Sequence, residues 1–318
     1  MFQQNVSMLN AIHLLGFNNS QDLNYLLFAI LLLIYCMTLC GNLLLVTLVV
    51  YSSDLHRPMY FFLTQLSIAD LLLTTDIVPI LLHTLLHKVG TISLGGCFTQ
   101  FYIFACSECS ECLLLTVMSY DRYLAICNPL HYTTIMNHNL CLKLAIMSWL
   151  LSLSLAMADI ATTSMLEFCG SNTIDHFFCD LFPLLELSCS DISSVLLKIQ
   201  FIAAPVLVCP FLIVIISYSC IIYVILKIPS ATGRQKTFST CSSHLIVVSI
   251  FYGTLFGVYI LPTKGQSLNI TKLLSLLYTV GTPLLNPVIY SLRNAQILKA
   301  FSTFRSYALQ KIHQMAAF

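Results

Sequence analysis

Seven ionisable side chains lie inside long apolar stretches of this 318-residue sequence. A charge in such a setting is costly and usually marks function. Carboxylates and a guanidinium held away from water can bind a cation, share a proton or form an ion pair that holds one conformation. The chemistry to look for is therefore cation binding or conformational switching, and the groups concerned are Asp70, Asp76, Glu108, Glu111, Asp121, Arg122 and Asp159.

The third apolar stretch carries four of these groups, and three of them recur at helical spacing. One residue in every three or four along it falls on the same helix face, and that face is expected to turn toward other helices. Cys97 and Arg122 are separated by roughly 38 Å of helix, at about 1.5 Å per residue, so they mark opposite membrane edges. The shared face consists of Phe104, Glu108, Glu111, Leu115, Met118 and Arg122.

Two sequence features could act as switches. Arg122 beside Asp121 can form an ion pair, and releasing its guanidinium would offer a bidentate donor to a partner protein. A plain interfacial pair is the alternative. Asn286-Pro287 removes a backbone hydrogen bond within a helix, which predicts a hinge with Asn286 satisfying a freed group, or else a static kink.

Composition identifies the elements that must position these groups. Hydrophobic residues make up 58% of the chain and charged residues only 8%, against about a quarter charged in soluble domains. About 20 helical residues cross a bilayer core, and lipid-facing backbone must be helical or closed into a barrel. We therefore predict an all-α membrane protein, a single seven-transmembrane helix bundle with spans near 23–51, 58–84, 97–127, 142–166, 196–226, 237–262 and 271–292.

The basic residues set the orientation. Most Lys and Arg fall on one side when the N-terminus is placed outside, as expected for cytoplasmic loops. Residues 294–308 pair Ile297, Leu298 and Phe301 with Lys299 at helical spacing, which favours a short amphipathic surface helix over a frayed tail. The 14 basic and 13 acidic residues nearly cancel, so we expect membrane lipids but no nucleic acid as partners.

Fourteen cysteines divide into two groups. Most lie in apolar stretches and are expected to pack as small hydrophobes. Cys106, Cys109 and Cys112 resemble a metal motif, but successive members rotate by about 60° around a helix, so one ion would reach two at best. Four extracellular cysteines allow three disulfide pairings. Asn5-Val6-Ser7 is a glycosylation sequon.

Several sequence motifs are spread over nearly the whole chain. They are Gly41-Asn42, Leu55-His56-Arg57-Pro58-Met59-Tyr60, Leu66-Ser67-Ile68-Ala69-Asp70, Met118-Ser119-Tyr120-Asp121-Arg122-Tyr123, Ser217-Tyr218, Lys236-Thr237-Phe238-Ser239-Thr240-Cys241-Ser242-Ser243-His244 and Pro283-Leu284-Leu285-Asn286-Pro287-Val288-Ile289-Tyr290. Together they resemble those of the rhodopsin-like G-protein-coupled receptors, and within them the vertebrate odorant receptors. Small departures, such as Leu124 for the family's frequent Val, are conservative.

The resemblance implies an odorant receptor that binds a small volatile molecule and activates a stimulatory, olfactory-type heterotrimeric G protein to raise cyclic AMP. It implies a plasma-membrane location, in the cilia of olfactory sensory neurons, with the N-terminus extracellular. The residues that would couple to the G protein or switch with it are Asp121, Arg122, Tyr123, Tyr218, His244, Asn286, Pro287 and Tyr290.

The resemblance also implies two disulfides and an ion site. It selects Cys97 with Cys179 and Cys169 with Cys189 among the possible pairings. Asp70 and Glu111 resemble a carboxylate pair that coordinates sodium below the ligand pocket, the alternative being a shared proton. No other cofactor is expected.

The implied ligand pocket lies between the outer halves of three helices. Its wall is mostly apolar, which suits a small molecule held by dispersion and desolvation with modest affinity. Glu108 is the unusual member, because its carboxylate could pair with a basic amine or be protonated and bonded within the bundle. The pocket residues are Phe104, Ala105, Glu108, Cys109, Ile202, Val206, Tyr252, Leu255, Phe256 and Tyr259.

Two other classes of protein compete with a receptor. The intramembrane acids alone would allow a channel or transporter, but the motifs occur once and no paired broken helices are evident. A membrane enzyme is not expected, because the sequence contains no Gly-x-Ser-x-Gly, His-Glu-x-x-His or Gly-rich phosphate loop and its histidines are scattered.

Overall fold

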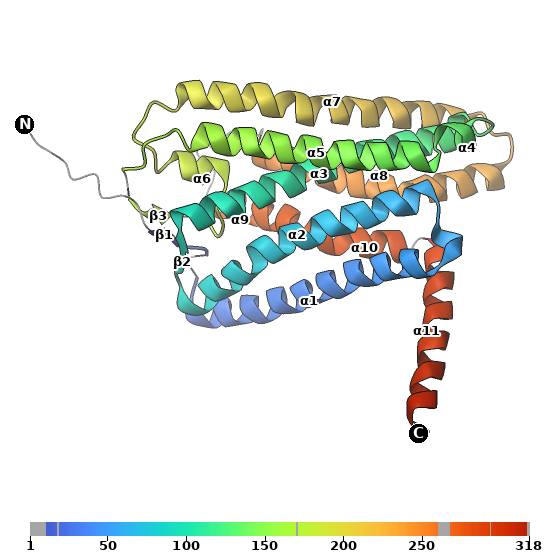
Figure 1. Cartoon of the computed structure of the whole chain (residues 1–318), viewed down its shortest axis with the longest axis horizontal. Helices are drawn as coiled ribbons and strands as arrows, with labels where there is room; N and C mark the ends of the chain where they lie inside the picture. The colour runs from blue at the N-terminus through green and yellow to red at the C-terminus, as the bar shows by residue number, and fades with distance from the viewer. Residues whose placement is uncertain (1–10, 18, 170, 260–267, 293, 317–318) are drawn as a thin grey trace, which may run out of the picture.

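The computed structural model describes residues 11–17, 19–169, 171–259, 268–292 and 294–316. The long helices run side by side in one bundle, and a further helix projects from one end (Figure 1). In chain order they are α1 (Gln21–Tyr51), α2 (Pro58–His87), α3 (Leu94–Cys127), α5 (His138–Thr163), α7 (Ser193–Leu226), α8 (Ala231–Tyr259), and a final span built from α9 (Leu268–Leu276), the π-helical turn η2 (Leu277–Gly281) and α10 (Thr282–Leu292).

This architecture confirms the predicted seven-span bundle. Six helices are long and apolar enough to cross a membrane, and α8 supplies the seventh as a pair of segments bent by 46°, Ala231–Ser239 and Cys241–Gly257. The projecting helix α11 (Ala295–Ala316) follows the last span at the inner end. It continues eight residues beyond the predicted surface helix.

Local sequence explains where several helices begin. The side chain of Ser93 accepts a hydrogen bond from the Gly96 amide at the start of α3, and Asn137 caps α5 through the Leu140 amide. Both caps satisfy first-turn amides that would otherwise lack a partner. With these capped first turns, α3 and α5 begin three and four residues before the predicted spans.

A small sheet covers the outer end of the bundle. β1 (Ala11–Leu14) lies between β2 (Gly90–Ser93), to which it is antiparallel, and β3 (Thr173–Ile174), to which it is parallel. The sheet therefore joins the N-terminal segment to the loops that precede α3 and follow α5. We call β1, β2, β3 and residues 175–180 the lid. Sequence analysis predicted no strand here, because strands of two to four residues are too short to show a period.

One disulfide ties the lid to α3, and a second joins two points of the segment between α5 and α7. Cys97 on α3 is bonded to Cys179 in the lid, and Cys169 is bonded to Cys189. These are the pairings that the family resemblance implied. The sequon at Asn5 lies outside the described residues. The remaining short elements are η1 (Ser53–Leu55), α4 (Tyr132–Ile135) and α6 (Leu181–Leu185).

A buried lysine fastens the lid to the last span. Lys272 on α9 donates hydrogen bonds to the Asp175 carboxylate, 2.5 Å away, and to the Gly16 carbonyl, 2.7 Å away. Its side chain is 3% exposed, whereas that of Asp175 is 43% exposed. The charge pattern placed Lys272 on the outer side, but did not indicate that it would be buried under the N-terminal segment.

This asymmetric burial gives a testable expectation. Asp175→Ala should destabilise the protein by about 3 kcal/mol, because it leaves the buried Lys272 ammonium without a counter-charge. Lys272→Met should cost less, because the remaining carboxylate reaches water. Thermal unfolding of the purified chain would measure both. The exposed pair of Lys299 and Asp54 is the control, since Asp54→Ala should cost under about 1 kcal/mol. Equal losses at Asp175 and Asp54 would contradict the role of this contact.

Candidate functional site

The predicted pocket residues belong to two apolar clusters of the core. Phe104 and Ala105 belong to the outer cluster, whereas Tyr252, Leu255 and Phe256 belong to the inner one. Ile202 and Val206 on α7 are half-buried, and the side chain of Tyr259 lies outside the described residues.

The floor of this region is a contact among three helices. Cys112 on α3 lies one turn below Cys109, and its Sγ is 3.2 Å from the Tyr252 hydroxyl of α8 and 3.4 Å from the Val206 carbonyl of α7. Phe211 packs against Tyr252, with ring centroids 5.0 Å apart. Sequence analysis placed Tyr252 and Val206 at the pocket but treated Cys112 only as a packing residue.

Aromatic side chains of the lid and the last span form the roof. Phe178 contacts Phe104 edge to face, with ring centroids 5.1 Å apart, and Tyr278 of η2 lies 5.9 Å from the same ring. His176 stacks on Phe177 and also meets Phe178. Sequence analysis missed Phe178 and Tyr278. The signal for Phe178 was its neighbour Cys179, whose bond to Cys97 places it about two helical turns above Phe104.

Burial perturbs two ionisable groups of the lid in opposite senses. Burial among the lid aromatics, together with the nearby Lys272 ammonium, lowers the pKa of His176 to about 3. Burial of the Asp180 carboxyl raises its pKa to about 6, although the Leu181 amide donates a hydrogen bond to it. Near neutral pH, the lid therefore holds an uncharged His176, while Asp180 titrates in the mildly acidic range.

Below the pocket, two carboxyls lie together in the bundle centre. Asp70 of α2 accepts hydrogen bonds from the Asn286 amide at 3.0 and 3.1 Å, and Glu111 of α3 is within reach of the same carboxyl. Glu111 is 1% exposed, and one of its oxygens and the Asn286 carbonyl oxygen have no hydrogen-bond partner among the described residues. Unpaired oxygens on converging side chains fit a small hard cation.

Glu108 lies one turn above Glu111 and extends a column of acids formed by Asp180, Glu108, Glu111 and Asp70. One of its carboxylate oxygens is shielded from solvent, and within the described part of the chain it has no hydrogen-bond partner. The acids that interact electrostatically with Glu108 include Asp180 in the lid, and Glu111 and Asp70 below it. The described buried cations, Lys272 and Arg122, are each paired with another acid. The column is therefore acidic along its length.

At the inner end, the predicted switch residues form a closed arrangement. Arg122 pairs with Asp121, its Nε donating at 2.9 Å, and the guanidinium is 12% exposed. The Tyr132 hydroxyl donates to the other oxygen of Asp121 at 2.8 Å. Both carboxylate oxygens are thus engaged, and the arginine is held against its own helix. Tyr123 is half-buried beside this pair and stacks on Tyr120.

A second contact joins three helices near the same end. His244 of α8 is fully buried, with Nδ1 2.6 Å from the Tyr218 hydroxyl of α7 and Nε2 3.1 Å from the Leu115 carbonyl of α3. A histidine bonded on both sides pins α8 against α3 and α7. The resemblance had grouped Tyr218 with His244 without indicating that they touch.

The last span is held to α1 around its proline. The Asn42 amide donates to the Pro283 carbonyl at 3.1 Å, and a Cβ at Gly41 would lie only 3.2 Å from the ring of Pro287. Glycine therefore permits the two helices to approach closely here. Tyr290 is buried one turn beyond Pro287. Asn286, expected to satisfy a backbone group freed by Pro287, bonds Asp70 rather than its own helix, so it ties the last span to α2.

Comparison with known proteins gives a consistent result. The family model described as "Olfactory receptor" matches residues 31–306. The chain is 45% identical to human olfactory receptor 11L1, covering 94% of this chain and 93% of that protein. It is 46% identical to human olfactory receptor 10A7, covering 98% and 99%. Squid rhodopsin has the same fold, with a TM-score of 0.71 at 17% identity over 92% of this chain and 88% of that one.

The opposed lid groups predict a specific response to pH. In the unfolded chain, His176 is protonated below about pH 6.5, whereas in the folded chain it stays neutral down to about pH 3. The stability that His176 contributes is therefore lost as the pH falls through that window. The folded chain retains the Asp180 proton up to about pH 6, against 3.8 when unfolded, so Asp180 adds stability as pH falls from 6 toward 4. In wild type, these two contributions oppose each other.

Single substitutions should separate them. Asp180→Asn should make the melting temperature fall more steeply between pH 6 and 4 than in wild type, because only the loss at His176 remains. His176→Asn should make it fall less steeply or rise. Thermal unfolding at pH 7, 6, 5 and 4 would measure the slopes, with the exposed His138 replaced by Asn as a control. Parallel curves for all four proteins would contradict the assigned burial.

Proposed function

Because its sequence shows that the chain belongs to the olfactory receptor family, we propose that it binds a small, mostly apolar volatile molecule and activates a stimulatory, olfactory-type G protein to raise cyclic AMP. As a member of that family with a rhodopsin fold, it is a multi-pass plasma-membrane signalling receptor and not an enzyme. The ligand, the pocket and the G-protein class are the proposed parts.

The composition of the pocket region supports the proposed ligand class. Its roof is Phe104, Phe178 and Tyr278, and its floor is Tyr252 with Cys112. Such a wall offers apolar surface and a few polar points, as in most small-molecule sites. A ligand of about ten heavy atoms, at about 0.5 to 0.7 kcal/mol per atom, would bind in the micromolar to millimolar range.

The closed inner end is the observation that carries the signalling proposal. Arg122 is paired with Asp121, and His244 joins α8 to α3 and α7. A ligand activates such a bundle only if it binds the open-inside state better than the closed one. Opening would separate α8 from α3, break the contact between His244 and Leu115, and free the guanidinium for a G protein.

A sodium ion fits the acids at the centre of the bundle. Asp70 and Glu111 would hold it, with the Asn286 carbonyl oxygen as a neutral ligand. Among the described residues, one Glu111 oxygen and the Asn286 oxygen lack a partner, while both Asp70 oxygens accept from the Asn286 amide. The ion would supply positive charge that lets both carboxyls remain ionised side by side. Because Asn286 also adjoins Pro287, this cluster connects α2 and α3 to the last span at its proline. A proton shared by the two carboxyls is the alternative.

A cyclic-AMP reporter assay tests the proposed function. Cells expressing the receptor should respond to members of a panel of volatile compounds, and Arg122→Ala should abolish the response because it removes the freed guanidinium. Arg305→Ala, an exposed arginine on α11, is the matched control and should respond normally at equal surface expression. A full response from Arg122→Ala, or ligand-gated current in cells that lack G proteins, would contradict the proposal.

The unpaired carboxylate of Glu108 gives a second expectation, about ligand chemistry. If an agonist amine pairs with it, Glu108→Gln should weaken amines by about tenfold or more relative to neutral analogues of the same shape, since a charged hydrogen bond contributes about 1.5 to 3 kcal/mol. Concentration-response curves for matched amine and alkane pairs would measure this. An unchanged ranking in the variant would end the hypothesis.

A further inference from the structure

A groove lies on the lipid-facing surface of α2 and α3, away from the proposed pocket. Its free volume is about 460 Å³, within the range of small-molecule sites of about 300 to 1,000 Å³. Ile68 and Leu72 on its wall are exposed large apolar residues, 39% and 44%, so this face meets lipid. The lining residues are Ile68, Leu71, Leu72, Thr75, Asp76 and Ile103.

The groove is separate from the pocket because neighbouring residues of α3 face different sides of the helix. Ile103 lines the groove, whereas the next residue, Phe104, points into the outer core cluster. Successive residues on a helix differ by about 100°, so the two side chains leave α3 in different directions. A molecule in the groove would therefore approach from the bilayer rather than through the lid.

Asp76 is the one acid among the lining residues. One of its carboxylate oxygens is shielded from solvent and has no hydrogen-bond partner in the part of the chain that the structure describes. An ionisable group at membrane depth is a functional-site candidate, and an unpaired acceptor there is costly. Asp76 is also held in place, because the Gln100 amide donates to its backbone carbonyl at 3.0 Å.

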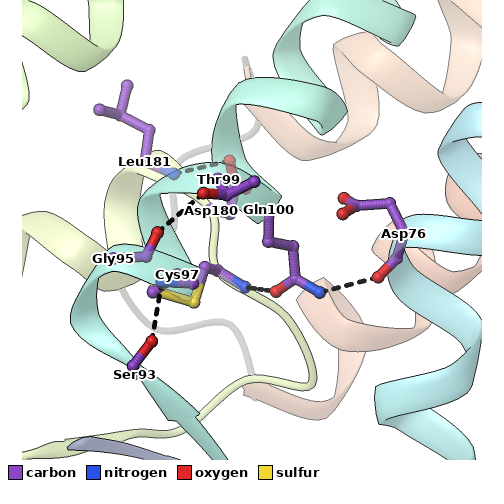
Figure 2. The surroundings of a disulfide bond; sticks show 10 residues. Asp76, Ser93, Gly95, Cys97, Thr99, Gln100, Asp180 and Leu181 are labelled. Carbon is purple, nitrogen blue, oxygen red and sulfur yellow. Dashed lines mark hydrogen bonds between the residues drawn. A yellow bond between two sulfur atoms is a disulfide. The ribbon is translucent and has the colours of Figure 1, made fainter.

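Figure 2 shows how that support reaches the lid. Gln100 lies between Asp76 and the disulfide of Cys97, with its amide carbonyl accepting from the Cys179 amide at 2.9 Å. The carboxyl of Asp76 is not engaged by any of the other residues drawn there. The backbone of Asp76 is thus fixed by the extracellular framework, while its carboxyl lines the groove and keeps one oxygen without a partner among the described residues.

The depth of Asp76 limits what could bind. α2 has 30 residues and is about 45 Å long, and Asp76 lies roughly 5 Å outward from its midpoint. With the midpoint of α2 taken as the centre of a bilayer core about 30 Å thick, this carboxyl lies about 10 Å below the headgroup boundary. A sterol or other lipid anchored by its polar head would hold its hydroxyl too high. A small molecule dissolved in the hydrocarbon could reach it.

We propose that this groove binds a small apolar alcohol from the bilayer, with its hydroxyl donating a hydrogen bond to Asp76 and its chain lying on Ile68, Leu72 and Ile103. The apolar lining of the groove matches the alcohol's chain, and the carboxyl of Asp76 supplies an acceptor for its hydroxyl. The site requires neither an odorant in the pocket nor a G protein, so its failure would leave the proposed function untouched.

Photolabelling of the full chain in lipid nanodiscs tests this site. The probe is an octanol carrying a diazirine on its chain, and the matched probe is the same compound without the hydroxyl. Peptide mass spectrometry should find the alcohol on residues 68–76 and 103, with the alkane labelling these residues about fivefold less at equal membrane concentration, the factor that one hydrogen bond supplies. Equal labelling by the two probes in wild type would overturn the proposal.

Variants sharpen the result. Asp76→Leu should reduce alcohol labelling to the level of the alkane, whereas Asp76→Asn, which keeps an acceptor oxygen, should retain it. Asp159→Leu is the matched control, because Asp159 on α5 also has an unpaired, shielded oxygen but does not line the groove. Undiminished labelling of Asp76→Leu would contradict the proposal, and so would displacement of the alcohol by cholesterol, which would identify a lipid as the occupant.

Discussion

Lipid offers no hydrogen-bond partners, and the rest of this structure depends on that constraint. Every backbone amide at membrane depth must be paired within the protein, which forces the apolar stretches into helices and places the strands β1, β2 and β3 outside the membrane. The same constraint acts on side chains. Asp70 is fully buried and bonded by Asn286, and His244 is bonded on both ring nitrogens. Oxygens left unpaired at this depth among the described residues, such as those on Glu108, Glu111 and Asp76, are therefore places where a ligand or ion would lower the free energy.

Two helices connect the outer end of the bundle to the inner end. α3 carries the disulfide to the lid at Cys97, the roof residue Phe104 and the arginine at its inner end. The last span carries Lys272 under the lid, Tyr278 against Phe104, and Asn286 on Asp70. A molecule that changed the packing around Phe104 would act on both helices at once. In the proposed receptor, this shared contact couples ligand binding to the last span at Pro287 and to the closed inner end at Arg122.

Sequence reasoning recovered most of the fold because the period and length of apolar stretches report directly on membrane helices. It predicted the ion pair of Arg122 with Asp121, and helical spacing put Phe104, Glu111 and Leu115 on one buried face. It could not find contacts between distant segments that have no repeating pattern. The sheet formed by β1, the burial of Lys272 beneath Gly16 and the meeting of Cys112 with Tyr252 depend on tertiary packing. The π-helical turn η2 likewise leaves no local signal, although it positions Tyr278.

The central claim is a bundle that crosses the membrane seven times, with the lid outside and the closed end at Arg122 in the cytosol. Antibody access to an epitope placed before β1 and another after α11, in intact and in permeabilised cells, tests it most directly. The account predicts that the N-terminal epitope is stained in intact cells, and that the C-terminal epitope is stained only after permeabilisation. Staining of both epitopes in intact cells, or of neither, would place the two ends on one side and contradict it.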